Sequence, residues 1–427
     1  MTPFSPGAAR RVYLGLTVSR WFPVGLVVAA VTLLPIDRGL TVTETLTLAS
    51  VTGAVVFALE LPTGGFADAL GRRPVLLAAA AAQVLAVALY VVADSVVIFM
   101  VAAAAMGVFR ALDSGPLEAW FVDTVHATSP GADVDRTLAH QGAVLGGSMA
   151  TGALVSGGLV WWHPVQAWSS MTLPFVVYAV LAAGHLVAVA VLLREPARAT
   201  AQDRSRLRDA AAAARQAPQT AVHGLRLAGG NRVLGSLLAL EACGSVAMVV
   251  MESFQPIRLA EILGSEHEAG ALMGPVASVG WAVFAGGAAL GGIMARRIGV
   301  ARAAMVARVC HGLGCVWMGL VAGPGALVAV YLITYGWHGA GGPLVHALLH
   351  RESSSATRAT VLSMASMCAF AAYAVASPVL GWAADATSTQ LAMVLGGAVS
   401  VGGMWFLRPA LRRERELRAA EPETVRI

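Results

Sequence analysis

Long apolar runs repeat along the whole chain, and short stretches rich in charged residues, glycine or proline separate them. A helix of about 18 to 25 apolar residues is long enough to cross the hydrocarbon core of a membrane. The pattern predicts twelve such helices, at residues 12–36, 43–66, 74–93, 96–124, 137–161, 171–193, 233–257, 269–295, 300–322, 325–349, 359–384 and 388–407.

The longest hydrophilic segment, residues 195–232, leaves six predicted helices on each side. We therefore expect an N-terminal six-helix bundle at 1–194, this linker, a C-terminal six-helix bundle at 233–407 and a charged cytoplasmic tail at 408–427. The basic linker either lies along an anionic leaflet or is a solvated connection. Weak echoes between the halves indicate an internal repeat. The sequence thus predicts an all-α membrane protein of two pseudo-symmetric bundles.

The composition excludes an ordinary water-soluble domain. Hydrophobic residues make up 57% of the chain, charged residues only 12%, and the mean hydropathy is +0.71. Soluble domains carry about 25% charged residues.

Metal binding is not indicated. The four cysteines lie inside apolar runs without the spacing of metal ligands, so we expect free thiols. His338 lies among the small residues of the segment GWHGAGG, which favours a position beside a cavity. A site built from His338, His346 and His350 would need ligands that a helix does not place on one face.

Arginine placement predicts the orientation of the helices. All 29 basic residues are arginines, and 24 of them fall on one side of the membrane if both termini are cytoplasmic. Cytoplasmic loops carry an excess of basic residues. Only Arg38 and Arg258 fall in the opposite loops, while Arg20, Arg110 and Arg308 lie within spans. We therefore expect a multi-pass membrane protein with both termini in the cytoplasm.

Several ionisable residues lie inside predicted spans, where each costs at least about 2.5 kcal/mol on insertion scales and so needs a partner or a function. They concentrate on the first and fourth helices of each half, at Arg20, Arg110, Asp113, Glu118, Glu241, Glu252 and His338. This concentration predicts a shared water-filled cavity for substrate and protons.

How these charges pair is open. Arg20 and Glu241 fall at nearly matching depths, so one alternative is an ion pair across the cavity, and the other is a separate partner for each. Arg110 and Asp113 are three residues apart on one helix and can partly neutralise each other. Glu241 and Glu252 are eleven residues apart, so a regular helix points both the same way.

The hinge after the second predicted helix carries a specific pattern. Residues 64–73 read G-G-F-A-D-A-L-G-R-R, which resembles the loop signature G-x-x-x-D-x-x-G-R-R/K of the major facilitator superfamily. With twelve predicted spans and a degenerate copy of the loop after the eighth helix, the resemblance covers the whole chain. It implies two bundles that open alternately to the two sides of the membrane.

The resemblance also implies a conformational latch, formed by Gly64, Asp68, Gly71, Arg72, Arg73 and Asp123. In it, Asp68 would face the start of the eleventh helix, and Arg72 would pair with Asp123 at the end of the fourth. A carboxylate at a helix N-terminus is stabilised by the helix dipole and by unpaired N–H groups. Gly71 permits the tight turn.

Four other segments, LELPTGGFAD, SGPLEAW, RATVLSM and SPVLGWAAD, resemble a bacterial drug-efflux-like branch of that superfamily. This resemblance implies a location in the bacterial inner (plasma) membrane. Two features depart from the efflux signatures. Arg110 is followed four residues later by Ser114, where the signature of the fourth helix has glycine, and Gly115 comes one position late. The glycine series of the fifth helix lacks the Gly-Pro-x-x-Gly-Gly ending of antiporters.

We therefore expect a proton antiporter that exports a small amphipathic organic compound or drug by alternating access. Asp113, Glu241, Glu118 and Glu252 are the expected proton carriers, in that order, with Arg20 and Arg110 as residues that tune them or bind an anion. A proton-coupled importer of an anionic small molecule and a membrane sensor that does not transport are the alternatives.

An enzyme is the least supported reading, because the sequence carries no catalytic, phosphate-loop or dinucleotide motif. We expect no cofactor, with the proton gradient as the energy source. The expected partners are a small-molecule substrate, protons and membrane lipids, anionic lipids among them. We expect no nucleic-acid partner and a monomeric protein.

Overall fold

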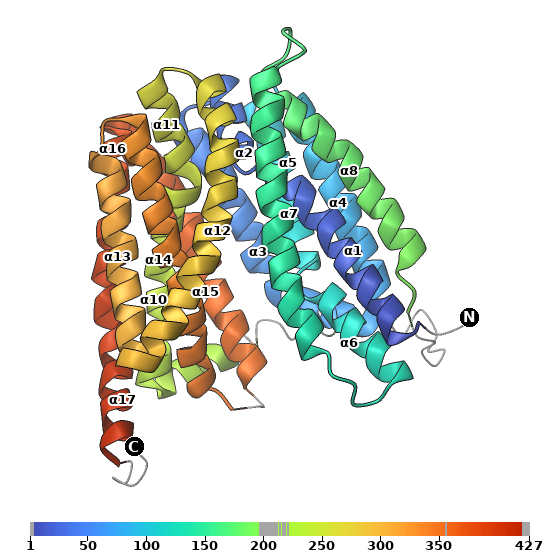
Figure 1. The fold of residues 1–427 in the computed structure, drawn as a ribbon, viewed down its shortest axis with the longest axis vertical. Coiled ribbons are helices and arrows are strands. Elements are labelled where there is room, and N and C mark those ends of the chain that lie inside the picture. The colour runs from blue at the N-terminus through green and yellow to red at the C-terminus, as the bar shows by residue number, and fades with distance from the viewer. Residues whose placement is uncertain are drawn as a thin grey trace. The chain divides into compact units, whose positions relative to one another are not determined.

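Figure 1 shows the computed structural model, which describes residues 4–195, 222–354 and 357–420 and the single positions 212, 215 and 219. The side chains of residues 61, 64, 65, 68, 418 and 420 are also outside the described part. Every regular element in these ranges is a helix. The predicted all-α class is therefore confirmed.

The N-terminal half holds the helices α1 (Pro6–Gly25), α2 (Ala30–Asp37), α3 (Val42–Leu70), α4 (Arg72–Val92), α5 (Val96–Leu112), α6 (Pro116–Thr128), α7 (Asp135–Trp162) and α8 (Thr172–Leu192). The C-terminal half holds α10 (Arg232–Val249), a π turn (Val250–Phe254), α11 (Gln255–Leu263), α12 (Glu266–Ile298), α13 (Val300–Leu320), α14 (Pro324–Arg351), α15 (Arg358–Ala386), α16 (Thr389–Gly402), a 3₁₀ turn (Gly403–Leu407) and α17 (Arg408–Ala420).

Eleven helical segments in the described ranges are long and apolar enough to cross a membrane. The remaining predicted span, 325–349, corresponds to α14, which has 28 residues and therefore the necessary length. Its three histidines, at positions 338, 346 and 350, lower its hydropathy. The helices thus match the predicted set, apart from interruptions in four of them.

The span predicted at 12–36 is one of these four, because it ends at Gly25 and restarts at Ala30. Pro23 cannot donate a backbone hydrogen bond, and glycine is a poor helix former. The N–H of Leu26 reaches back only three residues, to the carbonyl of Pro23 at 3.1 Å. A continuous helix was therefore the wrong prediction here.

The span predicted at 96–124 is also divided, between α5 and α6. Asp113 is the first residue beyond α5, Gly115 has a φ of +91°, and Pro116 begins α6. A positive φ suits glycine, and proline suits the first position of a helix. The apolar pattern continues across this break, which is why periodicity alone predicted one helix.

The other two differences lie in the C-terminal half. The span predicted at 233–257 contains the π turn and then continues as α11 to Leu263. The span predicted at 388–407 changes from α16 to the 3₁₀ turn at Gly403. Beyond it, the predicted tail at 408–427 is helical over Arg408–Ala420, as α17.

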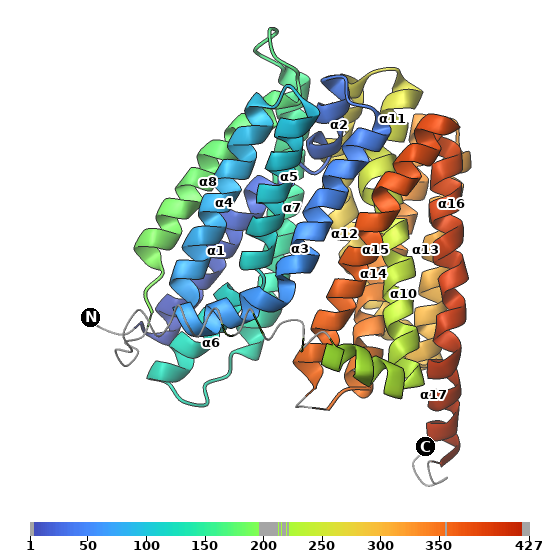
Figure 2. The same cartoon turned by 180° about the vertical axis from the view of Figure 1, so that it is seen from behind.

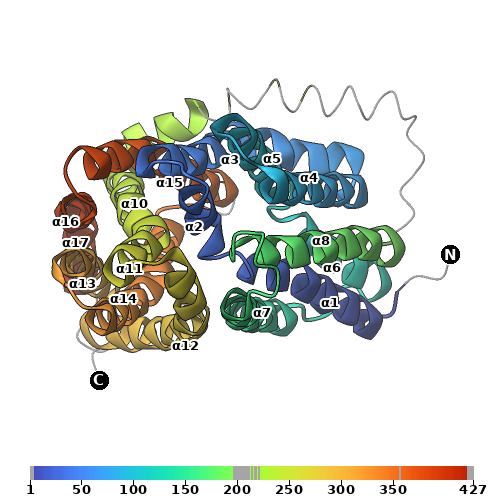
Figure 3. The same ribbon diagram turned by 90° about the horizontal axis from the view of Figure 1, so that it is seen from above.

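The chain divides into two compact units. Unit 1 comprises residues 1–219 and 263–281, and unit 2 comprises residues 220–262 and 282–427. Within unit 1, α4 packs against α5 and α8, and α3 packs against α5, as Figure 2 shows. Within unit 2, α13 packs against α14 and α16, which Figure 3 shows end-on.

In unit 1, charged side chains hold both ends of α4. Arg38 donates to the carbonyls of Tyr90 and Val91, at 3.0 Å each, at the C-terminal end. Glu195 accepts from the N–H of Arg73 at 2.7 Å at the N-terminal end. Each charge has the sign that the helix dipole favours. Desolvation lowers the pKa of the Arg38 guanidinium from its ordinary value, and two neighbouring carboxylates oppose that shift.

In unit 2, α13 is held in the same way. Glu414 of α17 accepts from the N–H groups of Val300 and Ala301, at 3.0 and 2.9 Å. Arg258 of α11 makes a long contact of 3.5 Å with the carbonyl of Val321 at the other end. Arg38 and Arg258, the two exceptions to the arginine pattern, therefore both bind the C-terminal end of a helix.

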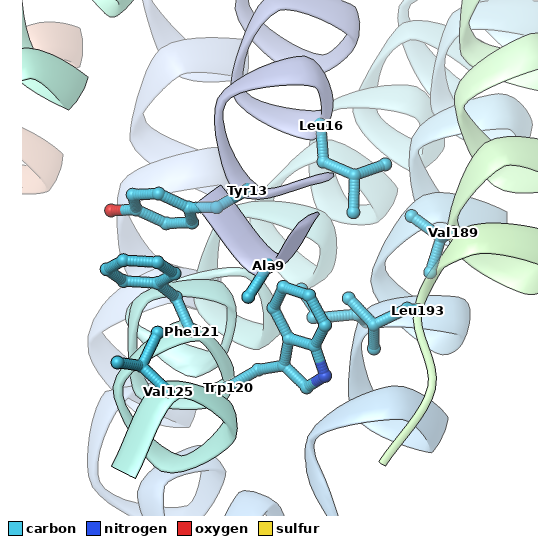
Figure 4. Close-up of a cluster of buried hydrophobic side chains, with 9 residues drawn as sticks. Ala9, Tyr13, Leu16, Trp120, Phe121, Val125, Val189 and Leu193 are labelled. Carbon is cyan, nitrogen blue, oxygen red and sulfur yellow. The ribbon is translucent and has the colours of Figure 1, made fainter. Parts of the chain in front are cut away.

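Apolar packing fixes α6 in unit 1 although a break separates it from α5. In the cluster of Figure 4, Tyr13 of α1 stacks on Phe121 of α6 with ring centroids 4.6 Å apart. Trp120 is 1% exposed, and its indole N–H donates to the carbonyl of Arg194 at 2.8 Å. Such aromatic pairs contribute about 0.5–1.5 kcal/mol beyond their buried area. α6 is therefore anchored to α1 and to the segment after α8.

Candidate functional site

The first part of the candidate site lies in unit 1, at the break between α5 and α6. Asp113 is only 4% exposed, and its Oδ2 forms an ion pair with Nε of Arg20 from α1. A buried charge is costly unless it is paired. Each of these two residues therefore accounts for the presence of the other.

Aromatic rings flank the arginine of this pair. The guanidinium of Arg20 lies 4.3 Å from the ring centroid of Trp21 and 5.7 Å from that of Phe109. Both distances allow cation–π attraction. The guanidinium of the pair thus has two aromatic rings beside it as well as the carboxylate.

Polar groups that the sequence reasoning missed lie close by in unit 1. His185 Nδ1 lies 2.8 Å from the hydroxyl of Ser19, and the amide of Gln83 donates to the hydroxyl of Tyr178 at 2.9 Å. The charge of Arg20 acts on both His185 and Tyr178. The sequence signal that could have found them is a polar residue inside an apolar run, Gln83 on α4 and His185 on α8.

The other predicted residues of the fourth span, Arg110 and Glu118, lie on either side of the break between α5 and α6. Arg110 is exposed, and its charge acts on Arg20. Glu118 is exposed in the first turn of α6, where its charge acts on Tyr13. For Arg20, the structure supports the alternative of a separate partner, since its ion pair is with Asp113 rather than with Glu241.

The second part of the candidate site is a cavity of about 90 Å³ inside unit 2, between α10, α13 and α14. Its ionisable lining residues are Glu241, Arg308, His311 and His338. Its apolar lining includes Met248, Trp337 and Val345. The cavity is large enough for a few water molecules.

Arg308 and Glu241 line the same cavity, and their opposite charges attract each other. Among the neighbouring groups whose charge acts on the Arg308 guanidinium, Glu241 has the largest effect. Gly244 makes room for the arginine, because a Cβ at that position would lie 2.2 Å from Nη1 of Arg308. A side chain at position 244 would therefore push the guanidinium out of its present place.

Two histidines lie beside this charge pair. The rings of His311 and His338 have centroids 5.2 Å apart. Nε2 of His311 lies 3.1 Å from the sulfur of Met251. A thioether sulfur can only accept a hydrogen bond, so Nε2 carries the proton and Nδ1 is the basic nitrogen of His311.

Arg308 and His311 did not enter the predicted site. Arg308 was counted within a span without a role, and His311 follows it three residues later, so both lie on one face of α13. An arginine and a histidine at this spacing inside an apolar run were the signal that could have found them.

Glu241 and Glu252, which are expected to point the same way, have different surroundings in unit 2. Glu241 lines the cavity, whereas Glu252 is exposed and accepts a hydrogen bond from Tyr373 of α15 at 3.4 Å. Glu252 lies inside the π turn, so the regular spacing behind the expectation does not hold at that residue. Tyr373, which contacts Glu252, and Cys368, on which the charge of Glu241 acts, both belong to α15. That the two carboxylates point the same way stays a prediction.

The latch residues form contacts at the start of α4. Nε of Arg72 lies 3.7 Å from Oδ2 of Asp123. Gly71 has a φ of +102°, and a Cβ there would lie 2.7 Å from a carboxylate oxygen of Glu195. Arg73 also donates from its side chain to the carbonyl of Ala190 at 2.7 Å.

Gly64 and Asp68 lie on α3, where their side chains are outside the described part. Within the ranges that are described, no group of three or more His, Cys, Asp or Glu residues could hold a metal ion. The four cysteines are free.

Several solved structures of transporters have a fold similar to that of this chain. One is the nucleoside transporter NupG, with a TM-score of 0.73, 11% identity, and coverage of 93% of this chain and 98% of that one. A second is a POT family transporter in complex with 5-aminolevulinic acid, with a TM-score of 0.68, 14% identity and coverage of 94% and 95%. A third is the peptide transporter POT in complex with sulfate, with a TM-score of 0.70, 14% identity and coverage of 96% and 95%. At these identities the likeness concerns the fold.

No curated protein sequence matches this chain. A family model does match: that of the Major Facilitator Superfamily covers residues 13–350. The superfamily inferred from the loop signature is therefore confirmed. The chain belongs to the Major Facilitator Superfamily and is a multi-pass membrane transporter of that type.

Proposed function

We propose that this transporter is a secondary active exporter that exchanges protons for a small amphipathic organic compound. The observation that supports proton coupling is the placement of two carboxylates within spans, each beside an arginine of its own unit. Asp113 faces Arg20 in unit 1, and Glu241 faces Arg308 in unit 2.

Such a pair responds to protons in a defined way. The pair is neutral while the carboxylate is ionised, and protonation of the carboxylate releases the guanidinium from its partner. Since the released cation must then find other groups, the protonated and ionised forms favour different arrangements of the helices that carry the pair. This is the link that alternating access requires between proton binding and conformation.

The cavity of unit 2 suits protons and water better than a whole substrate. Pockets for drug-sized ligands hold about 300–1,000 Å³, whereas this one holds about 90 Å³. The amphipathic substrate class and the direction of export are supported by the four segments that resemble the drug-efflux-like branch.

A second candidate is a proton-coupled importer of an anionic small molecule. The observation that favours it is the guanidinium of Arg308, which lines a cavity and could bind a carboxylate or phosphate. In that case the substrate would compete with Glu241 for the arginine.

The loop after α3 would act as the conformational latch, with Gly64, Asp68, Gly71, Arg72, Arg73 and Asp123 as its parts. Its supporting contact is that of Arg72 with Asp123. We also propose that the protein is a monomer in the bacterial inner membrane with both termini in the cytoplasm. Arginine placement supports that orientation.

The test begins with a ligand found by thermal shift among antibiotics, siderophores and amino-acid derivatives, because a ligand of the folded state raises its stability. Inside-out and right-side-out vesicles then receive opposite proton gradients. An exporter accumulates the ligand in acid-loaded inside-out vesicles, and Asp113→Asn and Glu241→Gln abolish that accumulation. The matched controls are the same substitutions at exposed carboxylates, Asp135→Asn and Glu268→Gln.

Other outcomes would replace the proposal. Accumulation only in right-side-out vesicles would establish the importer. A ligand that stabilises the protein but moves no protons would favour a sensor on the same fold.

A further inference from the structure

A row of polar and aromatic side chains runs through unit 2 from the π turn to the cavity. It consists of Glu252, Tyr335, His338, His311 and Glu241. The proposed function uses Glu241 but gives no role to the two histidines or the tyrosine.

The two carboxylates at the ends of this row are too far apart to exchange a proton directly. They are eleven residues apart along α10 and the π turn, which corresponds to about 16 Å at 1.5 Å per residue. That separation is about half of the hydrocarbon thickness of a bilayer. A proton that moves between them therefore needs intermediate groups.

The first intermediate group is Tyr335. The charge of Glu252 acts on Tyr335 and on Tyr331, which stack with ring centroids 5.5 Å apart. Tyr335 lies three residues before His338 on α14, and their ring centroids are 6.0 Å apart. A hydroxyl both donates and accepts, so Tyr335 can pass a proton between the carboxylate and the imidazole.

The next step crosses from α14 to α13. His338 and His311 have ring centroids 5.2 Å apart, and both line the cavity. The Nε2–H group of His311 donates its hydrogen bond to the sulfur of Met251, so only Nδ1 is free to take part in proton transfer. An incoming proton therefore binds at Nδ1 and later leaves from the same nitrogen. The His311 ring does not have to turn over between the two events.

The last step ends at Glu241. His311, Arg308 and Glu241 line the same cavity. Arg308, one turn from His311, repels a positive charge on the histidine ring, and the Glu241 carboxylate can accept the proton that the ring releases. Cavity water can join them. Other titratable groups beside the row are Tyr331, Tyr373, Cys243, Cys315 and Cys368.

We propose that protons pass between Glu252 and Glu241 through Tyr335, His338 and His311, so that the proton route lies inside unit 2. Each step moves one proton from a donor to an acceptor and breaks no other bond. The proposal rests on the proposed proton coupling and adds the residues that carry it.

Infrared spectroscopy tests the route without a transported substrate. The protein is held in one orientation in liposomes, and acid is added only on the side toward the C-terminal end of α11. The carbonyl band of protonated Glu241 is identified by its loss in Glu241→Gln. In the unaltered protein this band should rise after the acid pulse.

Removal of a relay group should delay that band. We expect His338→Asn, and independently His311→Asn, to slow it at least about a hundredfold, which is the lower end of the range for a positioned proton carrier. His346→Asn is the matched control, because His346 is an exposed histidine of the same helix outside the cavity lining. Melting temperatures identify any variant that has lost its fold.

An equal rate in the folded His338→Asn and His311→Asn variants would overturn the route, as would a Glu241 band that never appears in the unaltered protein. Nitrogen NMR gives a second readout, because a proton on Nδ1 of His311 at neutral pH would contradict the assigned tautomer. If the relay variants delay the band while vesicles show no coupled transport, the proposed function fails and the route stands. If vesicles show coupling that both variants retain, the route alone fails.

Discussion

In both units the third predicted span, α4 in unit 1 and α13 in unit 2, has charged side chains bound at its two ends. The charged residues inside the spans are arranged differently in the two units. In unit 1, α4 has Arg38 at its C-terminal end and Glu195 at its N-terminal end. In unit 2, α13 has Arg258 and Glu414 at the same ends. The charges inside the spans, by contrast, form a tight ion pair in unit 1 and line an open cavity in unit 2.

This difference indicates which features an internally repeated transporter keeps. The charged ends stabilise a helix through its dipole and its unpaired backbone groups, a need that both copies share. In the proposed function the intramembrane charges serve proton binding, which a single copy of each arrangement can provide. We infer that the scaffold stayed duplicated while the chemistry of the two units diverged.

The largest expected effect comes from the ion pair of unit 1. Asp113→Asn should destabilise the protein by about 3 kcal/mol, because it leaves the buried charge of Arg20 without a partner. The double variant with Arg20→Gln should recover more than about 1 kcal/mol of that loss. Denaturant titration of the single and double variants in detergent measures both values, and strict additivity would contradict the pair.

A smaller effect should test the duplicated ends of α4 and α13. Glu195→Ala and Glu414→Ala should each cost about 1 kcal/mol, since each removes an acceptor from unpaired N–H groups. Hydrogen exchange should rise in the first turn of the affected helix alone. Glu416→Ala, an exposed residue of α17, is the control. A loss confined to one of the two units would break the proposed equivalence.

The smallest effect should come from the contact of Arg72 with Asp123. Asp123 has a half-exposed side chain, and the two atoms are 3.7 Å apart. Such ion pairs contribute up to about 1 kcal/mol and weaken with salt. A double-mutant cycle with alanine at both positions, at low and high salt, measures it. A coupling above that range would mean that the latch contact is stronger than its geometry indicates.

The sequence predicted the helices because span length and apolar runs are local properties. It also carried the signal for the break at Asp113, since a glycine and a proline follow directly at 115 and 116. The π turn at Glu252 has no comparable local signal, so this irregularity could not be predicted.

The candidate site was predictable only in part. Charges inside spans were visible, and Arg20, Asp113, Glu241 and His338 all occupy polar surroundings. Their partners were not visible, because Arg20 meets Asp113 across 93 residues of chain and His311 meets Met251 across 60. Only folding reveals such distant neighbours.

The most direct test of the central claim counts protons. A compound that stabilises the purified transporter is added to liposomes that contain it and a pH-sensitive dye, with the membrane potential clamped. We predict proton movement opposite to the compound in the unaltered protein, and none in Asp113→Asn or Glu241→Gln. Compound movement without protons, or unchanged coupling in both variants, would contradict the account.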